Sequence, residues 1–152
     1  LALQYSLKAD QSGIVFKTKF QAGEHSVLTD ETKLVQIITN LLNNAFKFTP
    51  AGGLIEFEFE KLPGYASFSV KDTGPGIPEE YREKIFERFF QIMKKGTNKT
   101  EGTGLGLAIS KAYAELLNGE ILLRSETGKG SEFILKIPLS NGKNPGLKNF
   151  VL

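Results

Sequence analysis

The chain has 152 residues and carries 19 lysines and arginines against 17 aspartates and glutamates, a formal net charge of +2. This balance gives no reason to expect a nucleic-acid or membrane-surface partner. The absence of cysteine excludes disulfide bonds and thiolate metal sites, and no apolar stretch approaches the ~20 residues of a membrane span. The length fits one globular domain, and the start at Leu1 leads us to expect a piece of a longer protein.

The first half of the chain predicts helices and strands in mixed order. Apolar periodicity indicates a helix over 1–11, a strand over 14–20, an extended segment over 25–29, a helix over 30–48, and two hairpin strands over 54–61 and 65–72. Gly13 is placed to stop the first helix, and Asp30 is a plausible N-cap for the second. Pro50 and the glycines after it end that second helix.

The second half begins with the proline- and glycine-rich loop "TGPGIP" and one or two short helices over 79–91. "KKGTNKTEGTG" has no periodicity and predicts a long loop, of a length that is usually functional. A helix follows over 105–117, and its apolar stripe consists of Leu105, Ala108, Ile109, Ala112 and Leu116. Strands over 120–126 and 128–139 form a second hairpin, and the tail from Ser140 is linker-like.

This order of elements indicates an α+β fold. We expect a two-layer α/β sandwich, in which a mixed, mostly antiparallel sheet of about five strands is covered on one face by about three helices.

The second predicted helix has an unusual polar face, because three asparagines interrupt the apolar run "NLLNNAFKFTP". An interior asparagine costs up to ~0.7 kcal/mol relative to alanine. At 100° per residue, one arc of the helix contains Gln36, Asn40, Asn44 and Lys47, with Asn43 at its edge. A solvated face is one interpretation. The other is a magnesium site, since amide oxygens suit an ion whose other ligands are phosphates.

Asp72 continues the apolar parity of its strand, so its carboxylate should point toward the core. A buried carboxylate is costly without hydrogen-bond donors. The turn that follows is one source of donors. A ligand amine is the other, with Gly74 and Gly76 letting the ligand approach the backbone closely.

"GTGLGLAIS", from Gly102 to Ser110, places three glycines at alternate positions directly before a helix. Exposed N–H groups at a helix N-terminus bind phosphate. The spacing excludes a P-loop, and the lack of a preceding strand excludes a dinucleotide-binding fingerprint. Lys94, Lys95 and Lys99 would add positive charge for a triphosphate, and a plain solvated loop is the alternative.

Amides for a metal, a carboxylate for an amine and a glycine loop for phosphates are together the parts of a purine-nucleotide site. Their order resembles the catalytic, ATP-binding domain of two-component sensor histidine kinases, which has the Bergerat ATPase fold. "NLLNNAFKFTP" resembles the asparagine box, "DTGPGIP" the first glycine box, "IFERFF" the phenylalanine box, "GTGLGLAIS" the second glycine box and "GKGSEF" the closing glycine motif. The resemblance covers roughly residues 7–139.

The resemblance implies a role for each matching residue. Asn44 would coordinate magnesium, and Asp72 would accept a hydrogen bond from the exocyclic amine of adenine. The phenylalanines of "IFERFF" would anchor an ATP lid over about 92–102. The implied cofactors are ATP and Mg²⁺, with Asn44 as the metal ligand. The implied ATP-binding residues are Asn40, Asn44, Lys47, Asp72, Gly74, Gly76, Ile77, Lys94, Lys95, Gly102, Thr103, Gly104, Leu105 and Gly106.

Asn40 distinguishes the kinases from the related gyrase and chaperone ATPases, because those ATPases carry a water-activating glutamate at that position. An amide there favours phosphoryl transfer to an outside nucleophile over hydrolysis. The acceptor would be a histidine outside this chain, since His25 in "GEHSVL" lacks the His-Glu-x-x-x-Pro-like context. Gln91 stands where many relatives carry arginine, which leaves Lys94 or Lys95 to supply the lid's positive charge.

The implied function is transfer of the γ-phosphoryl group of Mg-ATP to a histidine, within a two-component sensor kinase, with no acid or base catalyst in this chain. The implied partners are the dimerisation and phosphoacceptor domain of a dimeric parent and a downstream response regulator. We expect a cytoplasmic location and no contact with nucleic acid or membrane. Residues 1–139 would form the domain, with 1–12 as the connection from a dimerisation helix, and 140–152 a linker or C-terminal tail. The alternatives are a serine-directed anti-sigma-type kinase and a non-catalytic ATP-sensing module.

Overall fold

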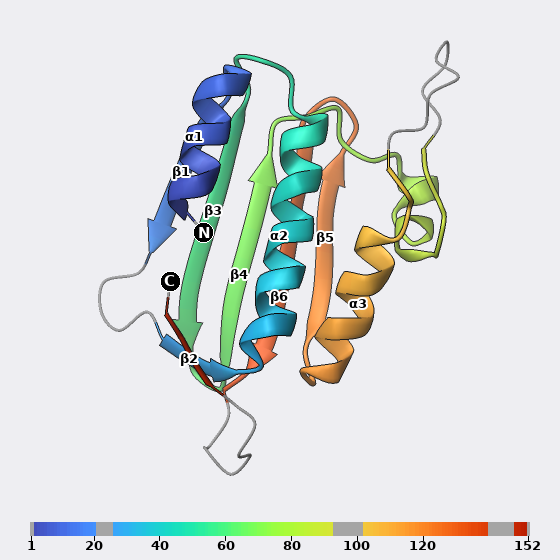
Figure 1. Ribbon diagram of the computed structural model, residues 1–152. Coiled ribbons are helices and arrows are strands. Elements are labelled where there is room, and N and C mark those ends of the chain that lie inside the picture. Colours follow the sequence, from blue (N-terminus) through green and yellow to red (C-terminus); the bar gives the residue numbers. More distant parts are fainter. Residues whose placement is uncertain (1, 21–25, 93–101, 140–147, 152) are drawn as a thin grey trace.

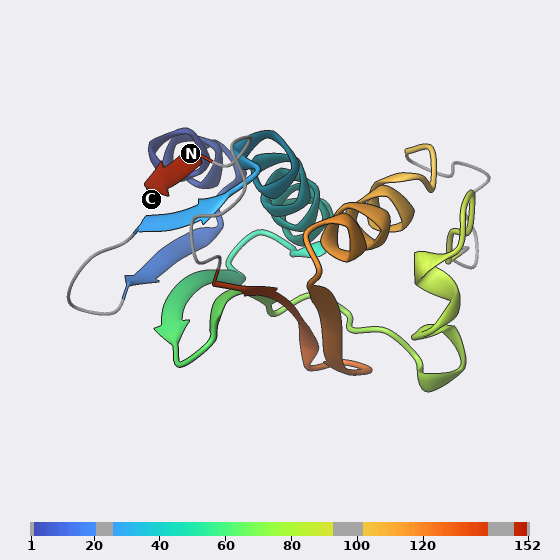
Figure 2. The same ribbon diagram turned by 90° about the horizontal axis from the view of Figure 1, so that it is seen from below.

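The computed structural model of the chain describes residues 2–20, 26–92, 102–139 and 148–151. Three α-helices lie side by side on one face of a sheet, and two short 3₁₀ helices lie at one edge (Figures 1 and 2). The elements are α1 (Ala2–Ser12), β1 (Val15–Phe20), β2 (Ser26–Thr29), α2 (Glu31–Phe48), β3 (Leu54–Leu62), β4 (Tyr65–Asp72), η1 (Glu79–Tyr81), η2 (Lys84–Phe86), α3 (Gly106–Leu116), β5 (Glu120–Glu126), β6 (Gly130–Pro138) and β7 (Lys148–Val151).

The main sheet has five strands in the order β1-β3-β4-β6-β5. β1 pairs with β3 in parallel, and every other pair in this sheet is antiparallel. The predicted α+β class and both predicted hairpins, β3–β4 and β5–β6, are confirmed. The β4–β6 register places Asp72 opposite Ser131, which brings the first and the closing glycine motifs together at one end of the sheet.

α2 forms where the sequence predicts it, because both of its ends are capped. The Asp30 carboxylate accepts a hydrogen bond from the Lys33 N–H at 3.1 Å, as an N-cap does. At the other end, the Thr49 N–H and hydroxyl both donate to the Ala45 carbonyl, and Pro50 follows. Its apolar stripe is buried and consists of Leu34, Ile37, Ile38, Leu41, Leu42, Ala45 and Phe46.

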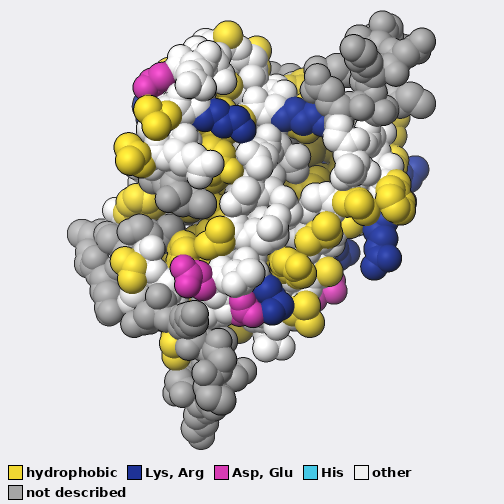
Figure 3. All heavy atoms as spheres, in the orientation of Figure 1, with side chains coloured by type: hydrophobic (Ala, Val, Ile, Leu, Met, Phe, Trp, Pro, Cys, Tyr) yellow, Lys and Arg dark blue, Asp and Glu magenta, His cyan; other side chains and the backbone are white. Residues whose placement is uncertain are grey.

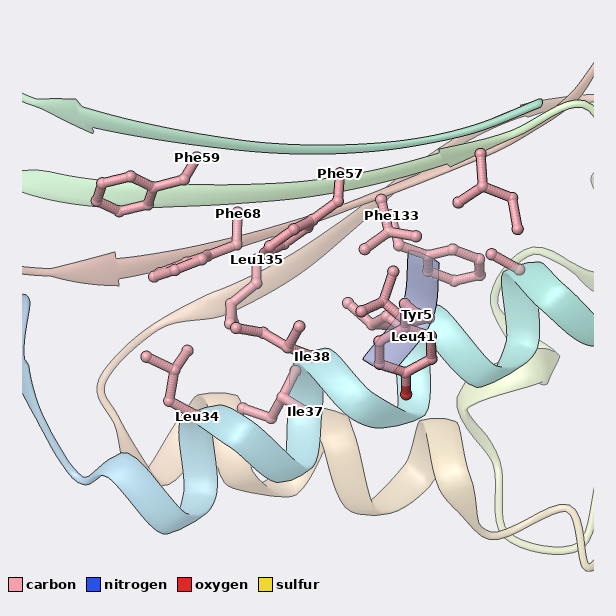
Figure 4. Packing of buried hydrophobic residues seen from close by; sticks show 14 of the residues in the cluster. Tyr5, Leu34, Ile37, Ile38, Leu41, Phe57, Phe59, Phe68, Phe133 and Leu135 are labelled. Carbon is pink, nitrogen blue, oxygen red and sulfur yellow. The ribbon is translucent and has the colours of Figure 1, made fainter. Parts of the chain in front are cut away.

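The core lies between α2 and the aromatic residues of the central strands. Ile38 and Leu41 of α2 point toward Phe57 of β3 and Phe68 of β4 (Figure 4). Burying each such side chain stabilises the fold by about 1.5–3 kcal/mol. Because this packing consumes one face of α2, the asparagine face is left on the opposite side of the helix.

α3 turns a different face to the core from its predicted apolar stripe. Ser110 and Ala114 are completely buried, whereas Leu116 is 64% exposed and Ile109 is 38% exposed. The small side chains of Ser110 and Ala114 let α3 pack closely, and the larger Leu107, outside the predicted stripe, packs against the core. Apolar periodicity alone predicts the wrong buried face of α3, because close packing here requires small side chains and not the most apolar ones.

The C-terminal segment contains a strand that the sequence does not predict. β7 pairs antiparallel with β2, and Phe150 is buried in the core cluster. Four residues with two adjacent apolar side chains, Phe150 and Val151, carry too little periodicity to be recognised as a strand. None of the helices in the described parts of the chain is both long and apolar enough to cross a membrane.

Candidate functional site

Asn43 of α2 holds the first helix against the second. Its Oδ1 accepts hydrogen bonds from the Tyr5 hydroxyl at 3.2 Å and from Lys8 Nζ at 3.1 Å. The Tyr5 ring also stacks on Phe46, with centroids 5.5 Å apart. Asn43 therefore acts in α1–α2 packing, in keeping with its place at the edge of the polar stripe.

Asn40 joins α2 to the start of α3. Its Nδ2 donates to the Gly106 carbonyl and to the Ser110 hydroxyl, both at 3.2 Å. Its Oδ1 accepts from Gln36 Nε2, also at 3.2 Å. Both N–H groups of the Asn40 amide are thus directed at α3, and the second glycine loop is held beside the polar face of α2.

Asn44 differs from the other two asparagines. It is half-buried, and its side chain forms no hydrogen bond with any of the described residues. An uncharged polar surface runs along α2 (Figure 3). Asn44 is therefore the one amide in this run whose oxygen is free to accept a ligand or a cation.

Lys47 lies one turn beyond Asn44 and reaches the second glycine loop. A methyl group added at Gly102 would lie 3.4 Å from Lys47 Nζ. The ammonium also lies 4.9 Å from the centre of the Phe48 ring. Lys47 thus places a positive charge beside the loop that the sequence predicts to hold phosphates.

Asp72 ends β4 with its carboxylate buried, at 6% exposure. Its Oδ1 accepts from the Gly74 N–H at 2.7 Å, and the Ser131 N–H is a second donor. Burial raises the pKa of the Asp72 carboxyl, and the two N–H donors partly oppose that rise. The predicted inward direction of this carboxylate is confirmed, and the turn supplies one of its donors.

The glycines of the first loop are required by the packing of the protein itself, apart from any ligand. A methyl group at Gly74 would lie 2.7 Å from Asp72 Oδ1, and one at Gly76 would lie 2.1 Å from the Glu126 carbonyl oxygen. Gly74 therefore makes room for the carboxylate, and Gly76, at φ +69°, for the β5–β6 hairpin. Ile77 N–H donates to the Ser125 hydroxyl at 2.8 Å, which fixes the loop against the same hairpin.

The second glycine loop enters α3 without a side-chain cap. Leu105 occupies the N-cap position and offers no capping oxygen, so the first N–H groups of α3 receive no capping bond from it. Gly102 and Gly104 adopt φ values of +100° and +70°, which other residues rarely adopt. Thr103 between them is exposed. The arrangement presents backbone donors and a positive helix end to an anion.

The phenylalanine box packs beside this loop. Phe86 meets Phe133 edge to face, and Phe90 packs on Tyr81. Phe89 is instead 72% exposed, and its φ is +65°. Its N–H donates to the Gly104 carbonyl at 3.0 Å, so the box supports the loop through backbone as well as through rings.

The predicted site residues come together along α2. The helix contacts the second glycine loop at Gly106 and Gly102. It approaches the first at Gly74, where an added methyl would lie 3.0 Å from the Phe48 carbonyl oxygen. Lys94 and Lys95 lie outside the described residues, as does His25.

Four residues join the site that sequence reasoning did not assign to it. Ser131 and Ser125 lie behind Asp72, with their hydroxyls 3.0 Å apart. Ser110 holds Asn40, and Gln91 Nε2 donates to the Gly102 carbonyl at 2.8 Å. The strand parity of "GKGSEF" locates Ser131, but the other three contacts depend on how separate elements pack.

This arrangement separates three kinds of chemistry over one helix face. The buried Asp72 acceptor, of raised pKa, lies near the C-terminal end of α2, where the Phe48 carbonyl is close to Gly74, and Lys47 places its charge beside Gly102 at the same end. The uncommitted amide of Asn44 lies one turn earlier in α2. No group of three or more histidine, aspartate or glutamate side chains within the described ranges is placed to hold a metal. A cation here would therefore take most of its ligands from a bound molecule and water.

Residues 29–141 match the family of histidine kinase-, DNA gyrase B- and HSP90-like ATPases. The chain belongs to this family. The sensor histidine kinase TmoS of Ectopseudomonas mendocina is 47% identical over 112 residues, which are 73% of this chain and 12% of TmoS. This ATPase domain thus spans a small part of the relatives it matches.

The fold of the chain is also similar to that of solved histidine kinase structures. The nucleotide-free catalytic domain of the histidine kinase ThkA is 33% identical with a TM-score of 0.78, covering 90% of this chain and 88% of that one. Full-length ShkA in complex with AMPPNP is 34% identical with a TM-score of 0.79, covering 95% of this chain and 29% of that one. ThkA is also known in complex with the response regulator TrrA, at 28% identity and a TM-score of 0.74, covering 93% of this chain and 39% of that one.

Proposed function

We propose that this domain binds Mg-ATP and transfers the γ-phosphoryl group to a histidine on a dimerisation domain outside the chain, as part of a cytoplasmic two-component signalling system. The observation that carries the proposal is that the three asparagines of α2 differ in their hydrogen bonds. Asn40 and Asn43 are engaged in packing contacts, and Asn44 alone is left free between the two glycine loops.

The nucleotide is held between the two glycine loops, beside the C-terminal half of α2. The Asp72 carboxylate has oxygen lone pairs beyond the two backbone hydrogen bonds it accepts. These lone pairs accept a hydrogen bond from the exocyclic amine of adenine. Gly76 and Ile77 border the base. The N–H groups from Thr103 onward bind phosphate oxygens, and Lys47 adds a positive charge at the same loop.

The donor set fits a magnesium ion. Mg²⁺ prefers hard oxygen ligands and is often held by one or two protein groups plus substrate phosphates. Asn44 offers one neutral oxygen, and the described residues supply no acidic cluster that would favour an all-protein site. When bound, the ion neutralises charge on the phosphates. The chain's own part is to orient the triphosphate through Asn44, Lys47 and the glycine loop.

Transfer to an outside nucleophile is favoured over hydrolysis because of Asn40. Its amide cannot accept a proton, and its N–H groups are used on Gly106 and Ser110. Phosphoryl transfer depends mainly on positioning and charge neutralisation, so a domain that fixes the nucleotide needs no base of its own.

The acceptor domain meets the chain at α3. Ile109, Ala112 and Leu116 lie exposed on its outer face, and hydrophobic side chains follow this helix in Figure 3. An apolar face next to the phosphate loop suits an amphipathic acceptor helix. A response regulator then takes the phosphoryl group from the histidine, in keeping with the complex that ThkA forms with TrrA.

The test is phosphotransfer from labelled ATP to a supplied dimerisation domain of a related sensor kinase. We expect Mg²⁺-dependent labelling that is lost in acid and retained in base, as phosphohistidine behaves. Label that survives acid but not base would indicate a serine-directed kinase. ATP binding without transfer to any acceptor, including the parent's own, would indicate a nucleotide-sensing module.

A further inference from the structure

Several carbonyl groups of the second glycine loop are held by hydrogen bonds from other parts of the chain. The Gly102 carbonyl accepts from Gln91 Nε2 at 2.8 Å, and the Gly104 carbonyl accepts from the Phe89 N–H at 3.0 Å. The Gly106 carbonyl completes the series with its bond from α2 at 3.2 Å. Two of these donors come from the segment that ends the phenylalanine box and the third comes from α2, while the Leu105 carbonyl accepts from the Ile109 N–H at 2.9 Å.

These hydrogen bonds fix the direction of the intervening N–H groups. In a trans peptide unit, a carbonyl and the following N–H point in opposite directions. Bonds to the carbonyls of residues 102, 104 and 106 therefore turn the N–H groups of Thr103, Leu105 and Leu107 away from the donors. No described residue accepts a hydrogen bond from the N–H of Thr103 or Leu105. These donors are left for an anion.

Gln91 is the one side chain in the series that does not belong to α2. The sequence marks it as a departure from arginine, which leaves the residue without a role. In the structure its role is that of a neutral donor to Gly102, a glycine at φ +100°. Without this bond, the peptide unit between Gly102 and Thr103 is free to rotate and to present carbonyl lone pairs, rather than an N–H, to the phosphates.

We propose that Gln91 is a positioning residue for the triphosphate: its amide holds the Gly102 carbonyl so that the Thr103 N–H faces the phosphates. The inference rests on the proposed function, because it assigns a residue to the phosphate end of the same site. It differs from the lid charge that the resemblance leaves to Lys94 or Lys95, since Gln91 acts through the loop backbone and contributes no charge. Binding of the base, at Asp72, does not depend on it.

The test compares nucleotide fragments in calorimetry with magnesium on the full chain. Gln91→Met keeps the length of the side chain and removes its donor. We expect the affinity for a non-hydrolysable ATP analogue to fall about fivefold, the worth of one neutral hydrogen bond, while the affinity for adenosine stays unchanged. Gln11→Met makes the same chemical change on the exposed face of α1 and should alter neither affinity.

The possible results distinguish failure of the Gln91 inference from failure of the proposed ATP-binding function. An unchanged affinity of Gln91→Met for the ATP analogue overturns the inference, and so does an equal loss for adenosine, which would indicate a general structural effect. Gln91→Ala should repeat the selective loss, and urea unfolding establishes that each variant is folded. A wild-type chain that binds neither the analogue nor adenosine overturns the proposed function itself.

Discussion

The Asn40 amide and the Ser110 hydroxyl lie 3.2 Å apart and join α2 to α3 across 70 residues of sequence. Ser110 is completely buried, so its hydroxyl has no access to water as an alternative partner. The helix with the asparagine face and the helix that begins at the glycine loop therefore form one unit. Changes at this contact should be felt in stability as well as in nucleotide binding.

Ser110→Ala should lower the free energy of unfolding by about 1 kcal/mol, because one hydrogen bond is lost and an Asn40 N–H is left without that acceptor. Urea unfolding at pH 7 measures the change. Ser67→Ala, on the outer face of β4, is the matched control and should shift stability by less than about 0.5 kcal/mol. Equal stability of the Ser110 variant and wild type would show that the contact contributes nothing.

The pH dependence of ATP binding should follow the ionisation of Asp72. Burial raises the pKa of this carboxyl above its ordinary value of 3.8. The ionised carboxylate is the stronger acceptor for the adenine amine, so ATP affinity should fall as the pH is lowered through that raised pKa. Calorimetry at several pH values measures this. A midpoint at or below 3.8 would contradict the assigned environment.

Asp72→Asn should abolish ATP binding without lowering stability at pH 7. The folded carboxyl has a higher pKa than the unfolded one, so its contribution to stability is fully present at low pH and is lost as the pH rises through the folded pKa. At neutral pH the buried charge is therefore a cost, which the amide removes. We expect the variant to be at least as stable as wild type at pH 7, with this advantage disappearing in acid. Unchanged ATP affinity in the variant would refute the adenine assignment.

The C-terminal strand should contribute measurably to stability. Phe150 is 7% exposed, and Phe150→Ala should cost about 3 kcal/mol through lost burial and a residual cavity. Val151→Ala, at a neighbouring position that is 69% exposed, is the control and should cost less than about 0.5 kcal/mol. Equal urea midpoints for the two variants would place β7 outside the cooperative fold.

The outer face of α3 should matter for transfer and not for ATP binding. Leu116→Ser should slow phosphotransfer to the acceptor domain by about fivefold, the effect of losing a contact worth about 1 kcal/mol. ATP affinity should be unchanged, because the 64% exposed Leu116 ends α3, whereas the predicted phosphate contacts lie at the start of that helix. Leu3→Ser on α1, at a position 77% exposed, is the control. Equal transfer rates for all three proteins would move the acceptor surface elsewhere.

The helix and the hairpins that could be predicted from sequence are those whose caps and apolar patterns lie within the segment itself. α2 has an N-cap at Asp30 and a strict apolar stripe, and the two hairpins have clean alternation, so their positions follow from sequence. β7 is too short to carry periodicity, and the buried face of α3 is chosen by the small volumes of Ser110 and Ala114. Such choices depend on the partner surface and leave no pattern within the segment.

The candidate site divides in the same way. The burial of Asp72 follows from strand parity, and the position of Asn44 on the polar arc follows from helical geometry. The partners of Asn40 and Asn43 are not accessible from sequence, because they belong to α3 and α1. The resemblance of the motifs identifies the family, and the structure explains what the two remaining asparagines do.

The claim that Asn44 is the metal-binding amide makes Asn44 and Asn43 a natural pair for comparison. Asn44→Ala removes no hydrogen bond to the described residues and gains about 0.6 kcal/mol of helix propensity, so the variant should be no less stable than wild type. Asn43→Ala loses the bonds from Tyr5 and Lys8, and should be destabilised by about 0.5 kcal/mol once the same gain is counted.

The most direct test is calorimetric titration of ATP into wild type, Asn44→Ala and Asn43→Ala, each with and without magnesium. Magnesium should strengthen ATP binding in wild type and in Asn43→Ala, and should have little effect in Asn44→Ala. A magnesium effect that survives in Asn44→Ala, or that is lost in Asn43→Ala instead, would contradict the assignment of Asn44 as the metal ligand.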